Sequence, residues 1–388
     1  MPSKVDQNSI RRRGVGLIAS DPDKVTPGYL LFSPLTSNST YLVDVEGKEV
    51  HRWTRPYRNG RHARLLPNGN LAINSIDPDT PRPFWFFNKY GGGIMSEINP
   101  ATGEVVHEHR DPLAHHDAHH YGDGTGKILY TSLEKLDHDA SATVLCGLAG
   151  TEADDGSVYA DVIKEVDGDG NIIFEWRVSE HLDRSTFPLQ PHYPREQWPL
   201  INSVYPLKDG NILCSLRSVS AVIIVSRKDK SILWHLDSNT VAQQHNATEL
   251  DNGNILLFDN GAFRHDQSFQ FSRALEVDRA TKSIVWTWSD PSKERFYSPF
   301  MGSAQRLGSV EPNAERGNTL ICESAFGRIV EIDDENNVCW EYFNPYFERY
   351  KEQRLLDVFP AESNALFRAY KYGPEHFPWL KKASNVSS

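Results

Sequence analysis

The stretch LKDGNILCSL, residues 207–216, joins a tight Asp-Gly turn to a short apolar strand. Asp-Gly and Asn-Gly pairs favour turns that connect neighbouring antiparallel strands. The same pattern recurs in LPNGNLAI (66–73), GDGTGKILY (122–130), LDNGNILLF (250–258) and, in a more degenerate form, ERGNTLI (315–321). A supersecondary unit that repeats along a chain is typical of propellers and other repeat architectures.

A second hairpin closes each unit. It consists of an alternating strand, a turn rich in Asp, Gly and Asn, and a strand with an aromatic residue near its end. The hairpins are YLVDVEGKEVHRW (41–53), SEINPATGEVVHEH (96–109), KEVDGDGNIIFEW (164–176), IIVSRKDKSILW (223–234), ALEVDRATKSIVWTW (274–288) and IVEIDDENNVCWEY (329–342). They predict an all-β, six-bladed β-propeller of four-stranded blades.

The first unit is too short to form a complete blade by itself. Gly28 to Trp53 leaves room for only about three strands of ordinary length. Residues 364–370, NALFRAY, have strand character near the other end of the chain. We predict that this C-terminal strand pairs into the first blade, because that pairing closes the ring and hides both sheet edges. The predicted organisation is an N-terminal arm (1–27), a single propeller domain (28–372) and a C-terminal tail (373–388).

Charge and composition restrict the partners. The 388 residues carry a formal net charge of -11, which disfavours nucleic acid and anionic membrane surfaces. No window approaches the roughly 18 consecutive apolar residues of a membrane span. The basic run at residues 11–13 precedes no apolar segment of signal-peptide type, so we expect a soluble, cytoplasmic protein. The four cysteines lack CxxC spacing and are expected to be free thiols.

Polar residues stand in one register at the starts of the predicted innermost strands. Counting back from each turn glycine gives Arg61, His116, Asn202, His245 and, less directly aligned, Gly302. Because the first strand of every blade lines the central channel, we expect these residues to converge at one end of it. The same alignment places Arg217 and Asn260 near the end of the second strand of their blades, within reach of that mouth. The aromatic segment 81–93 is a candidate lid.

At these residues the sequence resembles the bacterial arylsulfotransferase family. The resemblance covers Gly28 to Tyr370, and its motifs are HHD (115–117), INS (201–203), SLR ending at Arg217, QHN (244–246) and FDNG (258–261). Members of that family are six-bladed propellers that transfer sulfuryl groups between phenols through a covalent sulfohistidine, independently of PAPS.

The resemblance implies that His245 is the nucleophile, that His116 supports it, and that Asn202 and Arg217 hold the sulfuryl oxygens. It also implies a small aromatic or anionic substrate and no cofactor. Arg61, His115, His192 and Asn260 are the further candidates for substrate binding. The chain departs from the family pattern at Leu200, where the family has histidine, and at Asn246, where threonine or aspartate is usual. The export signal and the small N-terminal domain of secreted members are not visible either.

Two other interpretations stay open at this stage. In the first, one divalent metal ion is bound by His116 and His245 together with His192 or His265, and the protein is a lyase or hydrolase. Leu200 favours that interpretation, because the usual histidine donor is missing there. In the second, the propeller is not an enzyme, and its polar mouth binds an anion or a peptide.

Overall fold

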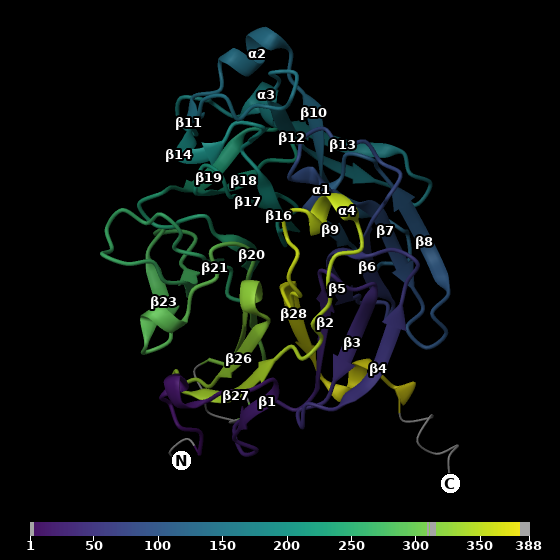
Figure 1. The fold of residues 1–388 in the computed structure, drawn as a ribbon, viewed down its shortest axis with the longest axis vertical. Coiled ribbons are helices and arrows are strands. Elements are labelled where there is room, and N and C mark those ends of the chain that lie inside the picture. Colours follow the sequence, from purple (N-terminus) through teal and green to yellow (C-terminus); the bar gives the residue numbers. More distant parts are fainter. Residues whose placement is uncertain (1–3, 309, 311–315, 381–388) are drawn as a thin grey trace.

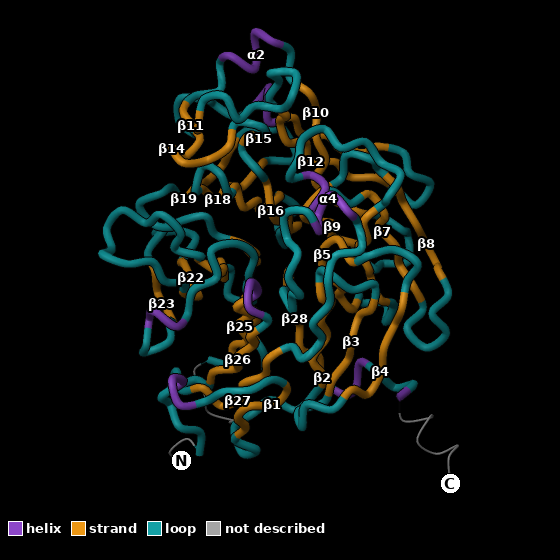
Figure 2. The backbone as a smooth tube through the Cα atoms, viewed as in Figure 1, coloured by secondary structure: helices purple, strands orange, loops and turns teal. Residues whose placement is uncertain are grey.

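Six antiparallel sheets surround a central axis in the computed structural model, which describes residues 4–308, 310 and 316–380 (Figures 1 and 2). This confirms the predicted six-bladed propeller. From the axis outward, the first blade consists of β28 (Leu366–Tyr372), β2 (Tyr29–Pro34), β3 (Ser39–Val43) and β4 (Glu49–Thr54). The second consists of β5 (Asn59–Leu65), β6 (Leu71–Ile76), β7 (Gly93–Ile98) and β8 (Val105–Arg110). The third consists of β9 (His115–His120), β10 (Ile128–Lys135), β12 (Tyr159–Val166) and β13 (Ile172–Arg177).

The other three blades follow the same order. They are β16 (Ile201–Pro206), β17 (Ile212–Leu216), β18 (Ala221–Val225) and β19 (Ile232–Leu236); β20 (His245–Glu249), β21 (Ile255–Asp259), β22 (Arg273–Val277) and β23 (Ile284–Trp288); and β24 (Ser303–Arg306), β25 (Thr319–Glu323), β26 (Arg328–Ile332), β27 (Val338–Phe343) and β1 (Gly16–Ser20).

Short elements decorate the ring. β11 (Cys146–Leu148), in the insertion between β10 and β12, pairs in parallel with β14 (Leu189–Pro194), which lies in the connection between the third and fourth blades. β15 (Gln197–Trp198) in the same connection pairs with β12. The short helices are η1 (Ser9–Arg11), α1 (Phe87–Tyr90), α2 (His138–Ala142), α3 (Val178–His181), η2 (Lys293–Arg295), η3 (Ser324–Phe326), α4 (Gln353–Leu356) and η4 (Pro374–His376).

The repeated turn has the geometry that its glycine predicts. Gly69, Gly210 and Gly253 have φ values of 82°, 85° and 85°, in the left-handed region that favours glycine. In each case the glycine N–H donates to the carbonyl of the leucine three residues earlier, at 2.9, 2.9 and 3.0 Å. The recurring sequence motif is therefore the hairpin between the first and second strands of a blade.

Both ends of the chain close the ring. β28 pairs antiparallel with β2, which confirms the predicted C-terminal closure. β1 pairs antiparallel with β27 as a fifth, outermost strand of the sixth blade (Figure 1). The sequence pattern did not indicate this strand, which falls within the predicted arm. Phe377 in the predicted tail is 1% exposed and packs edge-on against Tyr29, while residues 381–388 of that tail lie outside the described residues.

In five of the blades a tryptophan side chain forms a hydrogen bond to the next blade. Each lies on the outer strand of the closing hairpin and donates its Nε1–H to a backbone carbonyl in the closing turn of the following blade. The pairs are Trp53 with Pro100 (2.8 Å), Trp176 with Lys230 (2.9 Å), Trp234 with Arg279 (2.8 Å), Trp288 with Asn336 (3.2 Å) and Trp340 with Val45 (2.8 Å). These bonds explain the aromatic residue near the end of most closing hairpins.

A buried ion pair joins strands across the axis. Arg368 on β28 donates two parallel hydrogen bonds of 2.9 Å to the carboxylate of Asp117 on β9, and both side chains are 4% exposed. Arg368 also donates to the carbonyl of Asn202 at 3.1 Å. This bidentate pairing raises the pKa of Arg368 above its ordinary value despite burial. The C-terminal strand therefore links the first, third and fourth blades.

Other predictions can be checked in the described part of the chain. Among those residues no helix is long and apolar enough to cross a membrane. The four cysteines are free thiols, as expected, with Cys146 exposed and the other three buried.

Candidate active site

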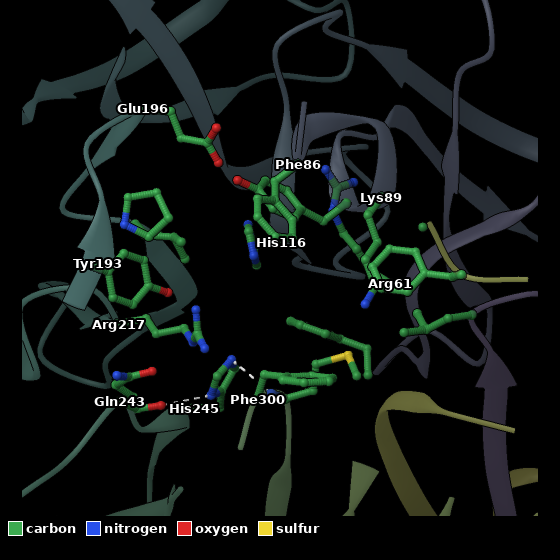
Figure 3. A pocket seen from close by; sticks show the side chains of 18 of the residues that line it. Arg61, Phe86, Lys89, His116, Tyr193, Glu196, Arg217, Gln243, His245 and Phe300 are labelled. Atoms are coloured by element: carbon green, nitrogen blue, oxygen red, sulfur yellow. Dashed lines mark hydrogen bonds between the residues drawn. The ribbon is translucent and has the colours of Figure 1, made fainter. Parts of the chain in front are cut away.

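A cavity of about 460 Å³ lies at the axis, on the side where the innermost strands begin (Figure 3). That volume lies within the range of roughly 300–1,000 Å³ found for sites that bind small molecules. Five of the residues singled out from the sequence line it: Arg61, His116, His192, Arg217 and His245. Of the residues expected to converge from their common register, Arg61, His116 and His245 line this cavity, whereas Asn202 and Gly302 do not.

His245 begins β20 and is held from both ring nitrogens. Its Nδ1 lies 2.7 Å from Oδ1 of Asn260 and 3.1 Å from the carbonyl of Gln243, so Nδ1 carries the proton. Nε2 consequently has the lone pair, which accepts a longer hydrogen bond of 3.2 Å from the backbone N–H of Met301. Burial, together with the nearby charge of Arg217, holds the pKa of His245 well below its ordinary value. The imidazole is therefore neutral at pH 7, with its lone pair on Nε2.

His116 is the end of a hydrogen-bonded chain that starts at a buried carboxylate. Nε2 of His115 lies 2.8 Å from Oδ1 of Asp161, and both side chains are completely buried. His115 must donate from Nε2 and accept at Nδ1, where Nδ1 of His116 approaches to 2.8 Å. His116 therefore donates from Nδ1 and keeps a lone pair on Nε2. Its pKa is lowered well below the ordinary value by burial and by the neighbouring His115 and Arg61.

A β-bulge creates this arrangement at the start of β9. Tyr130 pairs with Ala118 but the next residue, Thr131, pairs with His115, so residues 116 and 117 are left over in the ladder. His116 takes a positive φ of 45°. Bulges of this kind change the direction of side chains beside active sites. The consecutive residues His115 and His116 can thereby form successive members of one hydrogen-bonded chain.

Two guanidinium groups in the cavity form no ion pair with any described residue. Arg61 is 1% exposed, and its three guanidinium nitrogens have no hydrogen-bond partner among the described residues. The Arg217 guanidinium donates to the carbonyl of Pro299 at 3.5 Å, which is too long for a strong hydrogen bond. Burial lowers the pKa of each arginine to about 10, so both remain charged at pH 7. Cations that are buried or half-buried and form no direct ion pair favour an anionic ligand.

The predicted lid contributes to the same cavity. Segment 81–93 contains the short helix α1, and Phe86, Lys89 and Tyr90 line the cavity from it (Figure 3). Glu196, in the turn between β14 and β15, supplies the only carboxyl group among the described lining residues. Burial raises the pKa of Glu196 to about 7. The cavity is therefore aromatic and mainly cationic.

Residues 85–345, which are more than half of the chain, match the sequence model of the family described as Arylsulfotransferase (ASST). The matched range includes His116, Arg217 and His245. The chain belongs to the arylsulfotransferase family.

Solved structures resemble this arylsulfotransferase family member in fold. A protein of unknown function from Bacteroides caccae aligns with a TM-score of 0.53 and 13% identity, covering 89% of this chain and 99% of that chain. A catalytically inactive virginiamycin B lyase from Staphylococcus aureus, solved with quinupristin, aligns with a TM-score of 0.43 and 10% identity, covering 89% and 88%. A search of curated proteins found no match.

Three of the residues predicted for the arylsulfotransferase site lie behind the cavity wall. His115 and Asn260 contact His116 and His245, respectively, as described above. Asn202 is fully buried, and its Nδ2 donates to the carbonyl of Gln244 at 2.8 Å, which joins the fourth blade to the fifth. These residues position other groups and do not line the cavity.

The remaining histidines do not gather around one point. Nε2 of His192 lies 2.6 Å from Nε2 of Gln243, and its ring stacks on Phe263 at 3.5 Å. His265 is exposed and lies outside the cavity lining. Within the described ranges no cluster of three or more His, Cys, Asp or Glu side chains is placed to hold a metal ion. The metal site considered from the sequence, His116 and His245 with His192 or His265, is not assembled among these residues.

Several residues of the arylsulfotransferase site had no sequence signal. Asp161 lies on β12 and is held by the backbone N–H of Leu200 at 2.8 Å and by Gln197 at 2.9 Å. Leu200 itself lines the cavity where the family has histidine, so its backbone serves the His115 chain while its side chain is apolar. Lys89 could have been anticipated from its place in the aromatic lid segment, whereas Glu196 follows no recognisable pattern.

Proposed function

We propose that the protein transfers a sulfuryl group from a phenolic sulfate ester to a phenolic acceptor through a sulfohistidine at His245. One observation carries the proposal: a neutral, buried imidazole with its lone pair on Nε2 faces an aromatic cavity beside the guanidinium of Arg217, which forms no ion pair with any described residue. Membership of the arylsulfotransferase family supports the same reaction class.

Substrate binding uses the two arginines that form no ion pair with a described residue. A sulfate ester offers three terminal oxygens to guanidinium donors, and charge-assisted hydrogen bonds of this type are about twice as strong as neutral ones. Arg217 and Arg61 are the donors in this proposal. Since Arg61 is buried and Arg217 is half-buried, their charges stabilise negative charge on the oxygens more strongly than they would in water.

In the first step Nε2 of His245 attacks sulfur as the bond from sulfur to the phenolic oxygen breaks. The bonding electron pair leaves with the phenolate, which takes a proton from solvent. The imidazole then carries SO3 on Nε2 and keeps its original proton on Nδ1. This N–H donates a hydrogen bond to Oδ1 of Asn260. The substrate displaces the long Met301 N–H contact to free the lone pair for attack.

In the second step the acceptor phenol gives its proton to Nε2 of His116, and its oxygen attacks sulfur. The sulfur–nitrogen bond breaks, and the electron pair returns to Nε2 of His245. His116 then loses the proton to solvent. Asp161 and His115 act as positioning residues, because their hydrogen bonds keep the lone pair of His116 on the nitrogen that faces the cavity.

A turnover assay tests the proposal. With 4-nitrophenyl sulfate alone, the wild-type protein should release at most about one equivalent of nitrophenol, and sustained release should require the phenol acceptor. His245→Asn should lower the rate by at least about 10³-fold, because it removes the nucleophile. The matched control is His265→Asn, which changes an exposed histidine outside the cavity. Absence of wild-type turnover with several phenols, or an active His245→Asn variant, would reject the proposal.

A further inference from the structure

Lys89 is a cavity cation that the sulfuryl-transfer steps do not use. It lies on α1 of the lid segment, and its Nζ is 4.3 Å from the ring centre of Phe359 and 5.0 Å from that of Phe300. Among the described residues no carboxylate forms an ion pair with it. Burial lowers the pKa of Lys89 to about 8, with the charges of Arg217 and Arg58 acting in the same direction. The ammonium group is still protonated for the most part at pH 7.

The position of Lys89 separates it from the reacting groups. In Figure 3, Lys89 lies on one side of the cavity, while Arg217 and His245 lie on the other. Phe300 and Phe359 line the cavity next to Lys89. An aromatic ring bound with its sulfate at Arg217 can therefore extend toward an apolar wall that ends in a positive charge.

The charge balance of the cavity calls for a second negative group. Three cations line it, Arg61, Arg217 and Lys89, and the only carboxyl group among the described lining residues is that of Glu196. Burial raises the pKa of this carboxyl to about 7, so it offsets at most one positive charge. An aryl sulfate with a single sulfate group brings one negative charge. With Arg61 and Arg217 assigned to that group, Lys89 remains uncompensated.

We propose that Lys89, Phe300 and Phe359 form a second anion subsite that binds an acidic substituent on the aromatic ring of the donor or the acceptor. The preferred substrates are then phenols with a carboxylate, and their sulfate esters. The two phenylalanines pack against the ring and reduce solvent screening, which strengthens the ion pair between the carboxylate and Lys89. This inference rests on the proposed function for the phenolic character of the ligand.

Binding of matched phenols tests the subsite without any turnover. The probes are 3-hydroxybenzoate, 4-hydroxybenzoate and 4-hydroxyphenylacetate, each compared with its neutral amide by calorimetry at pH 7. At least one acid should bind the wild-type protein about tenfold more tightly than its amide, which corresponds to about 1.4 kcal/mol. Lys89→Met should reduce this preference to within about twofold, and Lys89→Arg, which keeps the charge, should retain most of it.

Lys293→Met provides a matched control. Lys293 also lies over a phenylalanine ring, that of Phe271 at 4.7 Å, but it is exposed and outside the cavity lining. The preference for the acid should be unchanged in this variant. Equal affinities of every acid and amide for the wild-type protein, or an undiminished preference in Lys89→Met, would overturn the subsite. Equal weakening of acid and amide by Lys89→Met would also overturn it, because Lys89 would then contact the phenol and not the acidic substituent.

The outcomes separate the subsite from the proposed function. A protein that prefers the acids in a Lys89-dependent way but transfers no sulfuryl group keeps the subsite and rejects sulfuryl transfer. A protein that transfers sulfuryl groups without that preference keeps the proposed function and rejects the subsite.

Discussion

Nδ1 of His116 lies 2.8 Å from Nδ1 of His115, and the far nitrogen of His115 lies 2.8 Å from the carboxylate of Asp161. The buried carboxylate thus determines which nitrogen of each imidazole carries a proton. Its effect extends through two rings to the lone pair that His116 presents to the cavity.

Asp161→Asn should lower kcat for a phenolic acceptor by about 10²-fold with little change in KM for the sulfate donor. An asparagine amide can donate to Nε2 of His115, which moves the His115 proton to Nδ1 and opposes the Nδ1–H of His116. Steady-state kinetics with 4-nitrophenyl sulfate and a phenol measure both constants.

A double-mutant cycle with His115→Asn provides the control for this prediction. If Asp161 acts through His115, the double variant should be about as slow as either single variant, since one chain is broken in each case. Fully multiplicative losses, or a normal kcat in Asp161→Asn with intact folding by circular dichroism, would contradict a positioning role.

The initial rate with 4-nitrophenyl sulfate should stay constant from neutral pH down to about pH 6 and should decline above neutrality. The pKa of His245 is held well below 6.5, so the nucleophile stays neutral and active down to about pH 6. Above its pKa of about 7, Glu196 becomes charged and repels the anionic donor, so KM for 4-nitrophenyl sulfate should rise. Initial rates between about pH 6 and 8.5 measure both effects.

Glu196→Gln isolates the alkaline effect. The variant cannot ionise at this position, and its KM should stay low beyond pH 7 while the acid side is unchanged. A loss of rate toward acid pH with a midpoint at or above pH 6.5 would show that the pKa of His245 is not lowered. An alkaline rise in KM that persists in Glu196→Gln would assign it to another group.

Trp340→Phe should destabilise the closed ring without changing the active site. The indole of Trp340 is 1% exposed and donates to the Val45 carbonyl at 2.8 Å, across the seam between the last and first blades. Loss of one hydrogen bond and of buried volume should reduce the free energy of unfolding by about 1–3 kcal/mol. Urea unfolding measures this change.

Trp379→Phe is the comparison for that experiment. Trp379 is partly buried in an aromatic cluster, but its Nε1 has no hydrogen-bond partner among the described residues. Its substitution should cost less than that of Trp340. An equal cost for both variants would mean that the blade-to-blade hydrogen bond contributes little beyond packing.

The fold was largely predictable because its repeated parts have local sequence signals. Turns such as Asp209-Gly210 need a glycine with positive φ, and the closing hairpins end in tryptophans that bond to the next blade. β1 was not predictable in this way. Its five residues, GLIAS, complete no repeat and pair only at the outer edge of the sixth blade, where no register position marks them.

The site was most predictable where residues share the register of the innermost strands. That register identified Arg61, His116 and His245, which line the cavity. It could not show that Asn202 bonds to a neighbouring strand, because bulges at the strand starts interrupt simple alternation. Asp161 on β12 was beyond reach for another reason: its contact with His115 joins residues far apart in sequence.

Sulfuryl transfer through His245 is tested most directly by the mass of the protein after brief incubation with 4-nitrophenyl sulfate alone. We expect an acid-labile adduct of about 80 Da, the mass of SO3, on the peptide that contains His245, and its disappearance when phenol is added. An unmodified wild-type protein that nevertheless turns over the donor, or an adduct located on His116, would contradict it.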